Sequence, residues 1–172
     1  MPNRRRFLQA AAALSAAPAI GGANAASADR KIAMAIYDER YAASRMFGQA
    51  ALALGARVRR INGDITDLWT GELYGMWREQ PAAIGGVTVR SAMFCLEQLA
   101  WDARMRIVHR TAHDADADPD WPTRTAQALL TQPVQADSLP AMLTMAESEA
   151  DEDTLYSWII APATSRARQR SA

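Results

Sequence analysis

The sequence has few cysteines and histidines, the residues that most often form disulfides or bind metals in a small domain, and it has no long apolar run that could anchor it in a membrane. It has one cysteine, Cys95, so an intramolecular disulfide is excluded and the hydrophobic core alone must hold the fold. It has two histidines, His109 and His113. The apolar run 10–20 is too short for a transmembrane helix, which takes about 20 apolar residues. We therefore expect no stable membrane insertion.

The chain also has no excess of positive charge. Its 172 residues, enough for one domain, carry 19 basic and 19 acidic side chains. The first 25 residues contain three arginines and no acid, which leaves 16 basic and 19 acidic residues in the remainder and a net charge of −3. A mildly acidic domain gives no electrostatic reason to bind nucleic acid, and no nucleic-acid partner is expected.

Sequence motifs typical of cofactor-binding or metal-binding sites are missing as well. There is no GxGxxG or Walker loop, no Gly-x-Ser-x-Gly elbow and no zinc-type spacing. The acidic loop 113–120 lacks the glycine and glutamate of a calcium-binding EF-hand, because Pro119 and Thr125 stand at those places. We assign no metal ligands and leave the cofactor unknown. Loose binding of a divalent cation by this loop stays open.

What is present begins with a recognisable leader. A run of arginines precedes an alanine-rich stretch and an Ala-x-Ala cleavage site, which are the three parts of a signal peptide. Arg4-Arg5-x-Phe7-Leu8 resembles the bacterial twin-arginine (Tat) motif. The resemblance covers residues 1–25 only, and an ordinary secretory signal with an arginine-rich start is the alternative. Cleavage is expected after Ala25, or else after Ala28.

The resemblance implies a route and a set of partners. Tat carries folded cargo to the periplasm, often loaded with a cofactor or bound to a second protein. The Tat export machinery is thus an expected partner, and a protein exported in the same complex is another. The residues expected to be recognised are Arg4, Arg5, Phe7 and Leu8.

Between residues 31 and 110, short apolar runs alternate with helical stripes. Strands are predicted over 31–37, 57–61, 82–87 and 105–109, and helices over 41–54, 65–80 and 89–103. A short helix over 122–131 and a last strand over 155–160 follow, while 139–145 favours neither state. Strand–helix alternation predicts a single three-layer α/β domain, residues 31–162, with a mostly parallel sheet of four or five strands flanked by helices. Residues 163–172 form a polar, basic tail.

Ligands of open parallel sheets bind beyond the carboxyl ends of the strands. That rule selects the ligand-binding candidates Asp38, Asp64, Gly85, Gly86, Thr88 and His109. Each also has a structural interpretation: Asp38 and Thr88 suit helix caps, and the glycine pair suits a turn. Glycines ahead of the third helix would leave N–H groups free for an anion.

Other side chains are expected to be structural. Cys95 is predicted on or beside the buried face of the third helix, as an inert thiol. The aromatic residues of the second and third helices are predicted to cover the sheet, and any that point outward would mark an interface. These aromatic residues are Trp69, Tyr74, Trp77 and Trp101.

Two functions follow as hypotheses. One is an exported periplasmic accessory or ligand-binding protein, with association with a redox enzyme as one form of it. The alternative is a small periplasmic enzyme that uses Asp38, Asp64 and His109 for acid–base chemistry at the carboxyl edge of the sheet. Whether that edge of the sheet holds a concave pocket or a flat apolar patch would discriminate between these two hypotheses.

Overall fold

The computed structural model describes residues 31–114, 118–134 and 153–163. Its five strands are β1 (Met34–Asp38), β2 (Val58–Ile61), β3 (Ile84–Val89), β4 (Met105–His113) and β5 (Leu155–Pro162). Its α-helices are α1 (Ala42–Ala53), α2 (Thr66–Leu68), α3 (Tyr74–Glu79), α4 (Arg90–Asp102) and α5 (Trp121–Thr131). The prediction for 139–145 lies outside the described residues.

All five strands form one sheet in the order β2-β1-β3-β5-β4. β2, β1 and β3 are parallel, while β5 is antiparallel to both of its neighbours, β3 and β4. The α/β class and the single five-stranded sheet flanked by helices are therefore confirmed. The sheet is mostly but not fully parallel, because the last strand enters its interior in the opposite direction.

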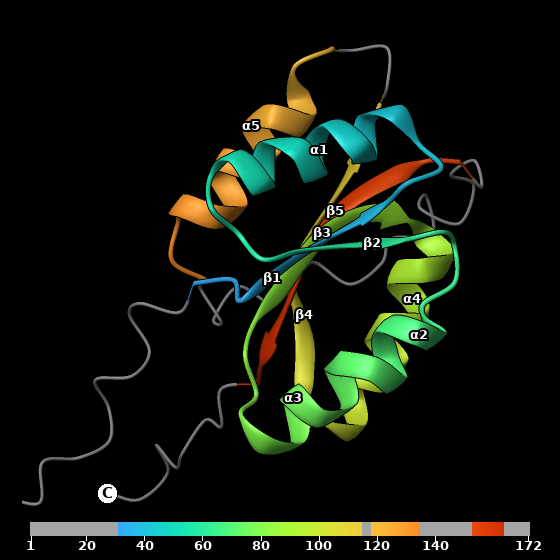
Figure 1. Cartoon of the computed structure of the whole chain (residues 1–172), viewed down its shortest axis with the longest axis vertical. Coiled ribbons are helices and arrows are strands. Elements are labelled where there is room, and N and C mark those ends of the chain that lie inside the picture. Colours follow the sequence, from blue (N-terminus) through green and yellow to red (C-terminus); the bar gives the residue numbers. More distant parts are fainter. Residues whose placement is uncertain (1–30, 115–117, 135–152, 164–172) are drawn as a thin grey trace, which may run out of the picture.

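Helices cover both faces of the sheet. Figure 1 shows α1 and α5 side by side on one face and α2, α3 and α4 on the other. With cover on both sides, every residue of β3 and all but the last of β5 are buried. Long continuous burial of this kind explains why both strands consist of apolar or small residues without alternation.

The inner strands pack so closely that glycine is required. A Cβ atom on Gly86 would lie 2.5 Å from the Ile36 carbonyl oxygen and 2.8 Å from Cζ2 of Trp158. Gly85 and Gly86 thus lie inside β3, paired with β1 on one side and β5 on the other. The prediction that they form an anion-binding turn before a helix is wrong.

Three local features differ from those expected. Thr88 belongs to β3 and does not cap α4, whose N-cap is Val89 without a side-chain hydrogen bond. β4 does not end at His109 but continues to His113, and its residues from His109 onward, all partly or fully exposed, pair with β5 at the edge of the sheet. Cys95 is exposed, so its predicted place by the buried face is also wrong.

The predicted second helix is divided into three parts. α2 runs into a π-helical segment, Trp69–Leu73, and then into α3. Gly71 and Gly75, both poor helix formers, lie in or just after this segment. Of the aromatic residues, Trp77 is buried as expected, whereas Tyr74 and Trp101 are about half exposed. No helix in the described ranges is long and apolar enough to cross a membrane.

Candidate functional site

The strand order reverses between the carboxyl ends of β1 and β3. β1 leads through α1 to β2 on one side, and β2 leads back across β1 to β3 on the other. This is the switch point at which open α/β sheets bind ligands. Asp38 ends β1 and Thr88 lies one residue before the end of β3, and both are fully buried. The sequence therefore placed both residues at the correct edge.

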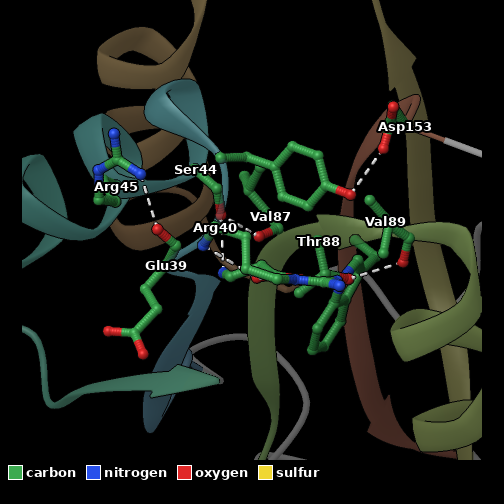
Figure 2. A network of polar contacts seen from close by, with 11 residues as sticks. Glu39, Arg40, Ser44, Arg45, Val87, Thr88, Val89 and Asp153 are labelled. Atoms are coloured by element: carbon green, nitrogen blue, oxygen red, sulfur yellow. Dashed lines mark hydrogen bonds and ion pairs between the residues drawn. The ribbon is translucent and has the colours of Figure 1, made fainter. Parts of the chain in front are cut away.

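The polar groups of Asp38 are engaged within the fold. Its Oδ1 accepts hydrogen bonds from Arg40 Nε at 2.9 Å and from the Arg40 backbone N–H at 3.2 Å, and its Oδ2 accepts one from Arg40 Nη2 at 2.7 Å. Its backbone N–H donates to Ser44 Oγ at 2.8 Å, and Ser44 donates in turn to the Val87 carbonyl at 2.5 Å (Figure 2). The carboxylate hydrogen bond raises the pKa of Arg40. Asp38 thus ties the turn after β1 to β3, and it does not cap α1, whose N-cap is Tyr41.

Thr88 is likewise satisfied by its neighbours. Its Oγ1 accepts a hydrogen bond from Trp158 Nε1 at 3.0 Å and donates to the Val89 carbonyl at 3.2 Å. Both partners come from the sheet itself, so the hydroxyl stabilises the contact between β3 and β5. Thr88 is also fully buried, so its hydroxyl is not offered to a ligand at this edge of the sheet.

Asp64 and His109 lie toward opposite edges of the sheet. Asp64 is exposed and accepts hydrogen bonds from the Thr66 hydroxyl at 2.7 Å and backbone N–H at 2.8 Å, which lower its pKa. It follows β2, whereas His109 lies within β4 at the opposite edge of the sheet. Four strand spacings separate those edges, about 19 Å. The three residues of the enzyme hypothesis are not brought together.

A concave cavity does exist at the carboxyl edge, between the start of α1, the end of β4 and the start of β5. This carboxyl-edge cavity has a volume of about 810 Å³. The side chains that define its character are Tyr41, His113, Asp114, Trp121 and Asp153. Tyr41 donates its hydroxyl to Asp153 Oδ1 at 2.8 Å.

A second cavity lies beneath α5, on the face of β4 and β5. This α5 cavity has a volume of about 630 Å³, and both histidines of the chain line it. His113 Nε2 lies 2.8 Å from Ser157 Oγ, and the His113 ring stacks on Trp121 with 3.8 Å between centroids and 7° between planes. A third cavity, of about 520 Å³, borders β2 and contains none of the predicted residues.

The electrostatics of the two cavities follow from burial. Desolvation, with a smaller repulsion from His109, lowers the pKa of His113 to about 4, and desolvation also lowers the pKa of His109. Burial and the hydrogen bond to Asp153 raise the pKa of Tyr41. At neutral pH both histidines and Tyr41 are therefore uncharged. The acidic residues that line the carboxyl-edge cavity are Asp114 and Asp153.

Sequence reasoning missed His113, Trp121, Asp153 and Ser157. One signal was available: His109, Thr111 and His113 alternate, as residues on one face of a strand do. The contact between His113 and Ser157 joins residues 44 positions apart, so no local pattern could have shown it.

Comparison with known proteins gave no matching family model, no matching curated protein and no matching solved structure. Within residues 31–114, 118–134 and 153–163, no three metal-ligating side chains gather at one point. The function therefore has to be argued from the cavities.

Proposed function

We propose that this protein is an exported periplasmic ligand-binding protein whose ligand occupies the carboxyl-edge cavity. The observation that carries the proposal is the cavity of about 810 Å³ at the edge where open α/β sheets bind ligands. Its volume lies in the range of small-molecule sites, and its lining combines the apolar surfaces of Ala42, Ala43 and Leu155 with a few polar groups.

The charge of the lining favours a small cationic ligand, such as an organic amine. Asp114 and Asp153 are the acidic residues of the lining, while His113 is held neutral by its low pKa. The nearby Arg40 guanidinium is paired with the Asp38 carboxylate and also interacts electrostatically with Asp153. We expect an ammonium group to be attracted to the acidic side chains of the lining and an anion to be repelled by them.

Isothermal titration calorimetry with putrescine as the probe tests this proposal. Asp153→Asn should weaken binding about tenfold, as the loss of one charge-assisted hydrogen bond would. Asp64→Asn is the matched control, because it removes an exposed carboxylate outside the cavity and should leave the affinity unchanged. Equal affinities for both variants, or stronger binding of succinate than of putrescine, would contradict the proposal.

The export route rests on the leader. Replacing Arg4 and Arg5 together by lysine keeps the positive charge but removes the twin-arginine pair that the Tat machinery is proposed to read. The uncleaved precursor should then accumulate in the cytoplasm, as seen by fractionation and immunoblotting. Unimpaired export of the double variant would favour the ordinary secretory signal.

A second candidate function is that of an accessory protein that is exported in complex with a redox enzyme. The observation that favours it is a stripe on α4, where Phe94 and Trp101 are seven residues apart and 54% and 50% exposed. Cys95 is exposed beside Phe94, so a thiol-reactive photo-cross-linker on it should capture the partner enzyme. Capture should be lost in the Phe94→Ala, Trp101→Ala double variant and kept in Leu52→Ala, which truncates an exposed leucine on α1. Cross-linking that survives the double variant would exclude the α4 stripe.

A further inference from the structure

We propose that Ser157 is the nucleophile of an acyl-transfer site in the α5 cavity, with His113 as its base and small carboxylic esters as its substrates. The proposal goes beyond ligand binding, because it concerns a different cavity and a different reaction, although His113 lines both cavities. It also differs from acid–base chemistry by Asp38, Asp64 and His109, none of which it uses as a reacting group.

The first argument is the geometry of the pair. Ser157 Oγ and His113 Nε2 are 2.8 Å apart, within the range in which an imidazole can take the proton of a hydroxyl. The antiparallel register places Thr111 opposite Ser157, so His113 is its diagonal neighbour two residues along β4. Residues related in this way lie on the same face of a sheet, here the face covered by α5.

The second argument is the state and orientation of the imidazole. Stacking on Trp121, at the first position of α5, fixes the plane of the His113 ring. Burial keeps the pKa of His113 near 4, so at neutral pH the ring is uncharged and able to accept a proton. The same low pKa makes it a weak base, because the imidazolium that forms is poorly stabilised. We therefore expect slow turnover, with an acyl-enzyme that accumulates where acylation outpaces deacylation, as it does for an ester with a good leaving group.

The third argument is the space beside the pair. The α5 cavity offers about 630 Å³, with apolar surface from Leu129, Val134 and Ile159 for an acyl chain. Its lining also includes the Thr111 hydroxyl and the Gln132 amide, which are hydrogen-bond donors for a carbonyl oxygen. An ester of a short carboxylic acid matches this combination.

The proposed reaction balances without any other reagent than water. The Ser157 oxygen forms a bond to the acyl carbon while its proton passes to His113 Nε2. The ester C–O bond then breaks, and the proton goes from His113 to the departing alcohol. Water repeats the sequence on the acyl-enzyme, which regenerates the Ser157 hydroxyl and releases the carboxylic acid.

A fluorophosphonate label and p-nitrophenyl acetate test the proposal on the mature protein. Peptide mass spectrometry should place the label on Ser157, and p-nitrophenyl acetate should give a burst of nitrophenol that matches one acetyl group per chain. Ser157→Ala should abolish both signals. Ser91→Ala, which removes an exposed serine on α4, is the matched control and should change neither.

The role of His113 has its own readout. His113→Gln should slow the labelling of Ser157 by a factor of about 100 or more, the usual loss on removal of a general base. In the native protein the labelling rate should rise as pH increases through about 4 and then level off, because only the neutral imidazole accepts the proton. Equal labelling of native protein and His113→Gln would overturn the proposal, as would the absence of label on Ser157. Neither result would alter the putrescine titration, so the two proposals fail separately.

Discussion

At the end of β1, the carboxylate and the backbone groups of Asp38 all have partners within the fold. Both carboxylate oxygens bind Arg40, the N–H binds Ser44, and the carbonyl accepts the Tyr41 N–H at 3.3 Å. The residue stabilises the turn that leads into α1, at a position where ligand-binding groups are common.

Asp38→Asn tests this structural role. The amide cannot accept both Arg40 hydrogen bonds, so we expect the free energy of unfolding to fall by about 2 kcal/mol, a typical value for hydrogen bonds to a charged group. Urea denaturation measures the change, and Asp64→Asn, at an exposed turn, is the control with an expected loss below about 0.5 kcal/mol. Unchanged or increased stability of Asp38→Asn would indicate a residue held at the expense of stability for a ligand.

His113 makes the stability of the protein depend on pH. Its pKa is about 4 in the folded protein and 6.5 in the unfolded chain, so the unfolded chain binds the proton first as pH falls. His113 therefore has no effect on stability above pH 6.5 and destabilises the fold increasingly from pH 6.5 down to 4. We expect a loss of about 2 kcal/mol over that interval, reduced from the fully buried value because the ring is half exposed.

His113→Gln should remove this part of the acid sensitivity. Between pH 7 and pH 4.5 the variant should lose about 1–2 kcal/mol less stability in urea than the native protein does. The comparison between the two proteins cancels the carboxylates, which titrate in both. Equal losses of stability in the variant and the native protein would show that the His113 imidazole is already protonated in the folded protein or is solvated as in the unfolded chain.

At the scale of the elements, Gly86 and Gly75 differ in whether their surroundings leave room for a side chain. A methyl group on Gly86 in β3 would collide with the backbone of β1, whereas a methyl group on Gly75 in α3 would meet nothing within 4 Å. Gly86→Ala should cost about 3 kcal/mol or prevent folding, since rigid backbone cannot move aside. Gly75→Ala should raise stability by about 0.5–1 kcal/mol, because alanine is the better helix former. Thermal unfolding of both variants checks the pair, and a stable Gly86→Ala protein would contradict the close packing of β1 on β3.

The helices and parallel strands were predictable because their signals are local. The apolar run of β1 and the stripe of α1 each lie within one stretch of sequence, and the structure confirms both. Burial in a sheet is decided by distant partners, so Gly85-Gly86 looked like a turn although it lies between β1 and β5. The strand signal of β4 was recognised only as far as His109, because the residues that follow are polar or small and partly exposed.

The candidate site was predictable only in its location. The rule for open sheets places a site at the carboxyl edge, and the carboxyl-edge cavity is there. Its lining comes from the starts of α1, α5 and β5 as well as from strand ends, so Asp153 and Trp121 could not be chosen from the strands alone. Ser157 and His113 meet only because β5 lies next to β4, an order that the strand pattern does not specify.

At the scale of the whole molecule, β5 is the strand that completes the sheet. It pairs with β3 and β4, which do not pair with each other. Ending the chain at residue 154 should therefore abolish cooperative unfolding, because β4 loses its only partner in the sheet. Ending it at residue 163 keeps every described strand and should leave the melting temperature within about 2 °C of the native value. A cooperative transition in the shorter chain, measured by circular dichroism, would contradict this role of β5.

The central position of β5 also sets an order of events during synthesis. The proposed export signal leaves the ribosome first, and the strand that closes the sheet leaves last, more than 120 residues later. At a synthesis rate of about 5–20 residues per second, the leader is exposed for roughly ten seconds before the domain can complete its sheet. A transporter that accepts only folded cargo would have to ignore the signal for that time. The newly made chain would need protection from premature engagement until its last strand is in place.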